Sequence, residues 1–194
     1  MSSKELGNVL IRADLNVPIN NGKILDNFRI LKAIEYIEEL QNISDSITFI
    51  SHLGRPQGVQ SSLSLKPVSI EMGKLLNQEV VFIDNYLDVK NKNILKTTQN
   101  GLFLLENLRF NEGEISNDDK FAKDIASSFD NYILDAFGAS HRKHASIVSI
   151  GNHLNSFQGP LMSKEIEELD KLLNETKDDF TIILGGAKVS DKLT

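Results

Sequence analysis

The chain has 194 residues, a length that allows one ordinary domain, or one domain and part of a second. Apolar residues make up 40% of it and charged residues 25%, which is normal for a globular protein with a sizeable core. The formal net charge of −6 argues against a general nucleic-acid binder, although a local cationic pocket for a small anion stays compatible with it. The absence of cysteine excludes disulfides and thiolate sites, and without a signal-peptide core or a membrane-length apolar run we expect a cytoplasmic protein.

The first predicted strand, residues 9–18, carries polar side chains inside an apolar run and ends at a proline. Asp14 and Asn16 are two residues apart, so in an extended chain their side chains emerge on the same face. Such a pair needs hydrogen-bond partners where it is buried. Two interpretations stay equally open: the pair caps a neighbouring turn, or it contacts a ligand.

A turn at residues 20–23 separates this strand from a predicted helix, whose apolar positions run from Ile30 to Leu40 at three- and four-residue spacing. Arg29 falls in the first turn of that helix, where a cation opposes the helix dipole. Either Arg29 is an exposed side chain whose position costs little, or it is aimed, with the helix terminus, at an anion.

The strand predicted at residues 47–50 leads directly into the segment SHLGRP, residues 51–56. Its glycine and proline force a turn, which puts His52 and Arg55 just past a strand's carboxyl end, where open α/β sheets bind ligands. Arginine is scarce, and four of the five stand where a predicted element begins or ends. The five are Arg12, Arg29, Arg55, Arg109 and Arg142. This placement indicates bidentate recognition of phosphate or carboxylate.

The middle of the chain continues the alternation of helices and strands. We expect a helix at 67–76, a strand at 79–83, a polar loop with a short helix at 84–99, a strand at 101–105, a capped helix at 117–129 and a strand at 132–134. Arg109 and Arg142 follow two of these strands, again on the carboxyl side. The sequence therefore predicts that several arginines gather at one end of the sheet.

Two histidines and an aspartate near Arg142 invite a second interpretation. His141 and His144 are three residues apart and could share a helix face as metal ligands. No third ligand of matching character stands near them in the sequence, so we favour histidines in an anion pocket or at a helix start. Asp135 follows a strand beside three cations, and we interpret it as their salt-bridge partner rather than as a general base.

The last part of the chain begins a new set of elements. A loop at 151–158 and a helix at 161–173 precede a strand at 180–184, which runs into GGAKVSDK, residues 185–192. A strand, paired glycines and a helix start carrying lysine form the general plan of a phosphate-binding loop, although neither the Walker pattern nor the dinucleotide glycine pattern occurs. Because one isolated strand cannot form a stable layer, we expect that the chain is cut short at Thr194.

Five separated motifs together resemble the phosphoglycerate kinase family, in that family's order. They are RADLNVP (12–18), SHLGRP (51–56), LENLRF (105–110), DAFG with HR (135–138 and 141–142) and GGAKVSDK (185–192), and they cover nearly the whole chain. The resemblance implies an α/β fold, with a Rossmann-like three-layer α/β/α substrate domain at residues 1–159 that contains a mainly parallel sheet. A connecting helix at 160–179 and the first strand of a second, truncated nucleotide-binding domain at 180–194 would follow.

Site residues are carried over position by position. The resemblance implies that Asp14 and Asn16 contact the glycerate hydroxyl region and that Arg29 reaches the phosphoryl group in flight. The substrate's own phosphate would be held by a basic patch of His52, Arg55, Arg109 and Arg142. The nucleotide would be bound by Gly186, Ala187, Lys188 and Lys192, with Lys188 also near the transferring group. The expected catalytic residues are thus Arg29 and Lys188.

The implied reaction is a reversible phosphoryl transfer that converts 1,3-bisphosphoglycerate and ADP into 3-phosphoglycerate and ATP. Mg²⁺ would arrive with the nucleotide and find its protein ligand beyond residue 194, so no metal ligand is expected within this chain. Because the attacking oxygens are already anionic, the reaction needs charge neutralisation and in-line positioning rather than a strong base. We expect a monomer without nucleic-acid or membrane partners.

Two other functions stay open at this point. If most of the nucleotide domain is absent, the chain alone would be a non-catalytic phosphoglycerate-binding module without turnover. A generic sugar-phosphate enzyme would remain only if the five motifs were discounted.

Overall fold

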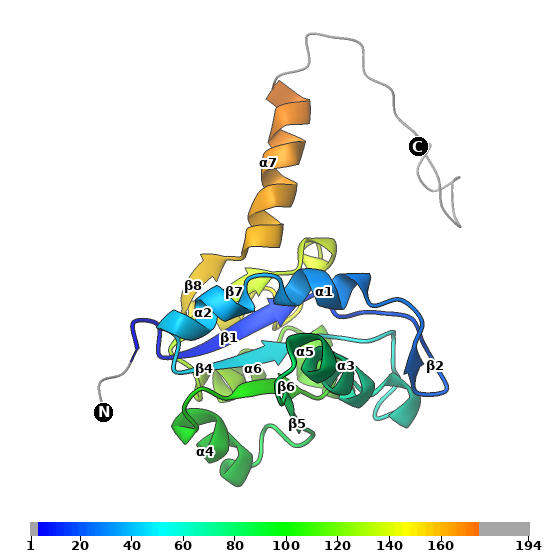
Figure 1. Ribbon diagram of the computed structural model, residues 1–194, viewed down its shortest axis with the longest axis vertical. Helices are drawn as coiled ribbons and strands as arrows, with labels where there is room; N and C mark the ends of the chain where they lie inside the picture. Colours follow the sequence, from blue (N-terminus) through cyan, green and yellow to red (C-terminus); the bar gives the residue numbers. More distant parts are fainter. Residues whose placement is uncertain (1–3, 175–194) are drawn as a thin grey trace. The chain divides into compact units, whose positions relative to one another are not determined.

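The computed structural model describes residues 4–174, so the predicted strand at 180–184 and the loop GGAKVSDK lie outside the described residues. One compact unit ends at Ser163, and a second begins at Lys164. Six parallel strands of the first unit form a sheet in the order β5-β6-β4-β1-β7-β8, several of which run side by side in Figure 1. These strands are β1 (Asn8–Ala13), β4 (Ser46–Ile50), β5 (Val81–Ile83), β6 (Leu102–Leu105), β7 (Asn131–Asp135) and β8 (Asn155–Gln158).

Helices connect these strands, as the alternating pattern predicts. They are α1 (Phe28–Ile34), α2 (Ile37–Ile43), α3 (Lys66–Leu76), α4 (Val89–Thr97), α5 (Glu112–Ile115), α6 (Asp119–Ala126) and α7 (Pro160–Asn174). A small antiparallel hairpin of β2 (Ile19–Asn20) and β3 (Lys23–Ile24) forms at the predicted Asn-Gly turn, where Asn21 and Gly22 both have positive φ. Within residues 4–174 no helix is both long and apolar enough to cross a membrane.

Two apolar cores lie on the two faces of the sheet. Side chains alternate along β1, so Val9 and Ile11 join one core while Leu10 joins the other. The first core contains buried residues of α1, α2 and α3, and the second contains buried residues of α4 and α6. Helices therefore cover both faces, as continuous apolar strands of a parallel sheet require. The predicted α/β fold with a mainly parallel sheet is confirmed.

Three local predictions differ from the structure. The helix expected through Leu40 is two helices, because the helical hydrogen bonding is interrupted at Tyr36. Ile34 and Ile37 are both buried, so the apolar spacing continues across the interruption. The first strand ends at Ala13 rather than at Pro18. The loop expected at 151–158 contains β8, whose four side chains are all exposed, so its pairing with β7 depends on the backbone and leaves no apolar pattern in the sequence.

Candidate anion-binding site

The predicted site segments follow strands that are neighbours in the sheet. Because β6, β4, β1 and β7 are adjacent and parallel, their carboxyl ends meet at one edge, where parallel α/β sheets bind ligands. Asp14 and Asn16 follow β1, His52 and Arg55 follow β4, Arg109 follows β6, and Arg142 follows β7. The predicted substrate-binding residues that follow a strand therefore all lie in segments that start at this edge.

The loop after β4 is fixed by side chains from two other loops. The Gly54 amide donates to Oδ1 of Asn16 at 2.9 Å, and the Gly54 carbonyl accepts from Nη1 of Arg109 at 2.6 Å. Gly54 adopts φ +62°, a conformation that glycine takes without the penalty a side chain brings. Asn107 holds the preceding residue, accepting from the Leu53 amide at 3.2 Å and donating to the Leu53 carbonyl at 2.8 Å. The loop therefore has one defined path.

Asp14 and Asn16 share a half-buried face between the buried residues Ala13 and Val17, as their spacing predicts. Oδ1 of Asn16 caps the turn at Gly54, as the capping interpretation expects, and this bond does not involve its Nδ2. Asp14 accepts from the Asn16 amide at 3.2 Å and forms a 2.8 Å ion pair with Nη1 of Arg29. Arg29 stays half exposed, with 51% of its side chain accessible, and this pair links the start of α1 to the edge of the sheet.

Three arginines and one histidine form a cationic cluster, defined as His52, Arg55, Arg109 and Arg142. Arg142 lies close enough to act electrostatically on His52 and Arg109, and Arg55 acts on Arg109. Among the described residues no ion pair involves Arg55, Arg109 or Arg142. Three guanidinium groups are thus gathered without a carboxylate in contact, which is the arrangement of an anion site.

Arg109 is the most buried member of the cluster. Only 6% of the residue is exposed, and its Nε has no hydrogen-bond partner. Burial, together with the charges of Arg142 and Arg12, lowers the pKa of Arg109 to about 10. Because a buried guanidinium without a counter-ion is unfavourable, an anionic ligand would stabilise this side chain.

His52 differs from the cationic side chain that the sequence suggests. It is nearly buried, and its Nδ1 lies 2.8 Å from Nη2 of Arg12. Burial, followed by the charges of Arg12, Arg109 and Arg142, lowers the pKa of His52 to about 2. His52 is therefore neutral at physiological pH, and it can contribute a hydrogen bond to an anion but no charge.

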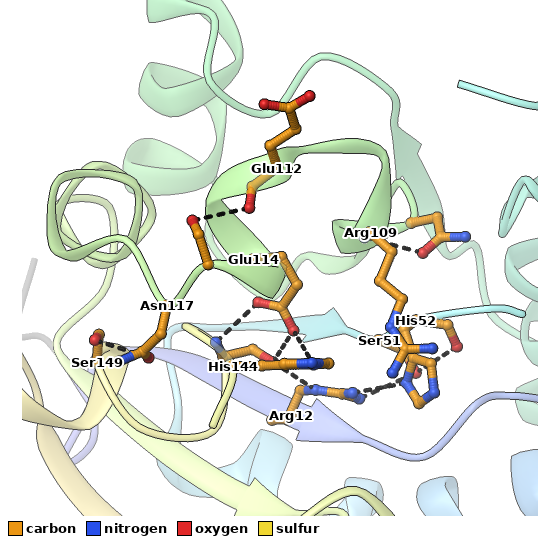
Figure 2. A network of polar contacts seen from close by, with 12 residues as sticks. Arg12, Ser51, His52, Arg109, Glu112, Glu114, Asn117, His144 and Ser149 are labelled. Atoms are coloured by element: carbon orange, nitrogen blue, oxygen red, sulfur yellow. Dashed lines mark hydrogen bonds and ion pairs between the residues drawn. The ribbon is translucent and has the colours of Figure 1, made fainter. Parts of the chain in front are cut away.

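Beneath the cluster lies a buried polar network, which Figure 2 shows with Arg12 between Glu114 and His52. Arg12 is 1% exposed and Glu114 is fully buried, and Ser146 connects them through its hydroxyl group. No individual role was predicted for Arg12, Glu114 or Ser146. The one signal in the sequence was Arg12, an arginine inside an apolar strand. Glu114 stands in a polar stretch that is typical of an exposed surface.

The prediction that Asp135 is the salt-bridge partner of the nearby cations is wrong. Asp135 does not pair with the cations: its Oδ1 accepts from the Met162 amide at 2.9 Å, so it caps the first turn of α7. A Cβ at Gly159 would overlap this carboxyl group, so only glycine fits at position 159 beside Asp135. The physical reason is geometric, since Asp135 still belongs to β7 and its carboxylate meets the segment after β8.

His141 and His144 do not share a helix face, because both lie in the non-helical segment after the short 3₁₀ turn Phe137–Ala139. His144 turns towards Glu114, with Nδ1 3.7 Å from Oε1, whereas His141 is exposed. Within residues 4–174 no three His, Cys, Asp or Glu side chains are grouped to hold a metal ion. The predicted nucleotide-binding residues Gly186, Ala187, Lys188 and Lys192 lie outside the described residues.

The fold is a parallel α/β domain whose cationic cluster stands at the carboxyl ends of its strands. A family model described as phosphoglycerate kinase matches residues 4–194. The chain therefore belongs to the phosphoglycerate kinase family.

Similar proteins agree with this assignment. The phosphoglycerate kinase of Wolbachia pipientis from Culex pipiens is 44% identical over 187 residues, which are 96% of this chain and 47% of that protein. The phosphoglycerate kinase of Dictyoglomus turgidum is 41% identical over 186 residues, or 95% of this chain and 47% of that protein.

Solved structures of phosphoglycerate kinases are also similar. The enzyme of Coxiella burnetii superposes with a TM-score of 0.82 at 34% identity, covering 97% of this chain and 48% of the other. The enzyme of Pyrococcus horikoshii gives a TM-score of 0.86 at 28% identity, covering 100% and 49%. The chain thus spans about half the length of the relatives it matches.

Proposed function

We propose that this chain supplies the phosphoglycerate-binding domain of a glycolytic phosphoglycerate kinase, a transferase that interconverts 1,3-bisphosphoglycerate and ADP with 3-phosphoglycerate and ATP. One observation carries the proposal: Arg55, Arg109 and Arg142 gather at adjacent strand ends, and no ion pair neutralises them among the described residues. A phosphate monoester near neutral pH carries a charge of about −1.5 to −2 and three acceptor oxygens, which this cluster would neutralise. Family membership favours the kinase over a non-catalytic module.

Each residue of the site receives a distinct role in this proposal. The cationic cluster binds the phosphate of the substrate, with His52 donating a neutral hydrogen bond. Asp14 and Asn16 approach the glycerate hydroxyl region, where Asp14 is also paired with Arg29. Arg29 is exposed at the start of α1 and is free to turn from Asp14 towards the transferring phosphoryl group. Neutralising charge in that transition state is worth on the order of a hundredfold in rate.

The nucleotide side of the reaction involves residues outside the described part. We propose that Gly186, Ala187, Lys188 and Lys192 contact the nucleotide phosphates, and that Mg²⁺ enters with ATP or ADP. The described residues hold no group of three His, Cys, Asp or Glu side chains that fits a metal ion. We further propose a substrate domain at 1–159, a connecting helix at 160–179, a nucleotide domain that starts at 180, and a cytoplasmic monomer.

Calorimetry with 3-phosphoglycerate tests the binding half of this proposal. We expect the 194-residue chain to bind the substrate, and the variant Arg142→Met to bind it at least about tenfold more weakly, because a charged hydrogen bond is lost. Lys74→Met is the matched control, since Lys74 is an exposed cation that pairs with Glu71 on α3. Equal affinities for the two variants would refute the assignment of the cluster.

A coupled assay with ATP and 3-phosphoglycerate tests the second half. The chain alone is expected to show essentially no turnover, because most nucleotide contacts would be missing. Robust turnover would refute the idea that a further nucleotide domain is needed, whereas substrate binding without turnover would agree with it.

A further inference from the structure

Arg12 and Glu114 are a buried pair of opposite charges, and the hydroxyl group of Ser146 bridges them. Nε of Arg12 donates to Oγ of Ser146 at 2.9 Å, and the same hydroxyl donates to Oε1 of Glu114 at 2.6 Å. The Ser146 amide also donates to Oε2 of Glu114 at 2.9 Å. Both carboxylate oxygens are therefore occupied, and the single hydroxyl proton of Ser146 has to point towards Glu114, away from Arg12.

The other end of the Arg12 guanidinium faces His52. Nη2 of Arg12 lies 2.8 Å from Nδ1 of His52, and Nη1 donates to Oγ of Ser51 at 3.2 Å and to the carbonyl of Ala13. A guanidinium only donates hydrogen bonds, so Nδ1 of His52 has to accept one. An imidazole whose Nδ1 accepts carries its single proton on Nε2.

We propose that Glu114, Ser146 and Arg12 act as a positioning relay that holds His52 as the neutral Nε2–H tautomer. This inference rests on the proposed function in one respect: the Nε2–H is the hydrogen bond that His52 offers to the substrate's phosphate. Arg12 and Glu114 are positioning residues, since they act through His52. They determine which nitrogen of His52 carries the proton and where the resulting Nε2–H donor points within the cationic cluster.

The charges around His52 support a fixed neutral state. Arg12 faces it from β1, Arg109 from the segment after β6, and Arg142 and His144 from the segment after β7. Protonating His52 would add a further charge among these cations and would put an N–H against the Arg12 donor. Among the described residues two carboxylates act on Arg12, Glu114 more strongly than Asp14, and Glu114 also acts on His144.

The carboxylate explains how Arg12 can be buried in this position. A guanidinium that is 1% exposed needs a counter-ion and satisfied donors. Glu114 is the counter-ion, and Ser146 bridges the two groups by hydrogen bonds. The same pairing fixes the plane of the guanidinium, because Nε, Nη1 and Nη2 all have partners. A guanidinium held in one plane imposes one orientation on the imidazole that it contacts.

Nitrogen NMR of the unaltered chain tests the inference without any ligand. In ¹⁵N-histidine-labelled protein, we expect the His52 ring to show an unprotonated Nδ1 and a protonated Nε2, with shifts that stay constant from about pH 5 to pH 8. Observation of the Nδ1–H tautomer, of an imidazolium, or of a titration within this range would overturn the relay.

Variants separate the relay from general packing. Ser146→Ala removes the bridging hydroxyl, and Glu114→Gln removes the charge with little change in shape. We expect the His52 resonances to show a mixture of tautomers, or a titration within the tested range, in each variant that retains the native circular dichroism spectrum. Ser149→Ala is the matched control, because Ser149 is also a buried serine on this segment but bonds Oδ1 of Asn117. Unchanged His52 resonances in folded Ser146→Ala would refute the relay.

Titration with 3-phosphoglycerate supplies the functional readout. Ser146→Ala is expected to bind about tenfold more weakly than the unaltered chain, the lower end of the value of one hydrogen bond to a charged group, and Ser149→Ala within about twofold. Affinity equal to the unaltered chain in Ser146→Ala would contradict the role of the Nε2–H. If the unaltered chain binds no 3-phosphoglycerate, the proposed function fails, while the NMR tautomer still decides the relay.

Discussion

Replacing Arg109 by methionine is expected to stabilise the fold while it damages the site. Arg109 is nearly buried, its Nε has no partner, and no carboxylate pairs with it among residues 4–174. Because its folded pKa lies below the value in the unfolded chain, the protonated guanidinium opposes folding at every pH below about 10. Methionine has a similar length and removes the charge.

The magnitude follows from two opposing contributions. The difference between the ordinary pKa of 12.5 and about 10 corresponds to about 3 kcal/mol, which solvent screening at the open side of the cluster reduces to about 2 kcal/mol. The variant also loses the 2.6 Å hydrogen bond to the Gly54 carbonyl, worth about 1 kcal/mol. We therefore expect the free energy of unfolding of Arg109→Met to rise by about 1 kcal/mol.

Urea unfolding followed by circular dichroism measures this gain, and calorimetry measures the loss of 3-phosphoglycerate binding. The affinity should fall about ten- to a hundredfold, because a hydrogen bond between two charged groups is removed. Lys120→Met is the control, since Lys120 is exposed and makes no ion pair among the described residues; both quantities should stay nearly unchanged. A loss of more than about 1 kcal/mol of stability in Arg109→Met would refute the view that its charge is uncompensated.

Three further outcomes are expected. His52 is neutral when folded, so below about pH 6.5 each pH unit should remove about 1.4 kcal/mol of unfolding free energy. In urea titrations His52→Gln should flatten this dependence of the unfolding free energy on pH. An unchanged slope would contradict the neutral state of His52. Gly159→Ala should lose about 2 kcal/mol by crowding Asp135, whereas thermal melts of Gly151→Ala should show almost no change. Arg29→Ala in the full-length enzyme should lower kcat about a hundredfold with little effect on the KM for 3-phosphoglycerate; the reverse pattern would exclude the role given to Arg29.

Much of the architecture could be predicted from the sequence because local signals and the sheet agree. The apolar runs of β1, β4, β6 and β7 are each followed by polar residues that end the strand. In a parallel sheet this order puts those residues at one edge, whatever the exact sequence of strands. β8 could not be found in this way, since its exposed NSFQ segment carries no apolar alternation.

The charged residues of the site were only partly predictable. Spacing and residue type pointed to Arg55, Arg109 and Arg142, because arginine at strand ends has few structural uses. The state of His52 could not be inferred, since it depends on Arg12, which reaches it across forty positions of the chain. The role of Asp135 was misjudged for a related reason: its partner is an amide at Met162, and backbone donors leave no mark in a sequence.

Gly54 is hydrogen-bonded on both sides, by Asn16 at its amide and by Arg109 at its carbonyl. Hydrogen exchange at this amide should then be slow in the free protein, although the segment is a loop. Under the proposed function, a loop held by these two bonds would add little ordering entropy to the association step. Encounter would be governed by diffusion towards a positive edge on a molecule whose net charge is negative.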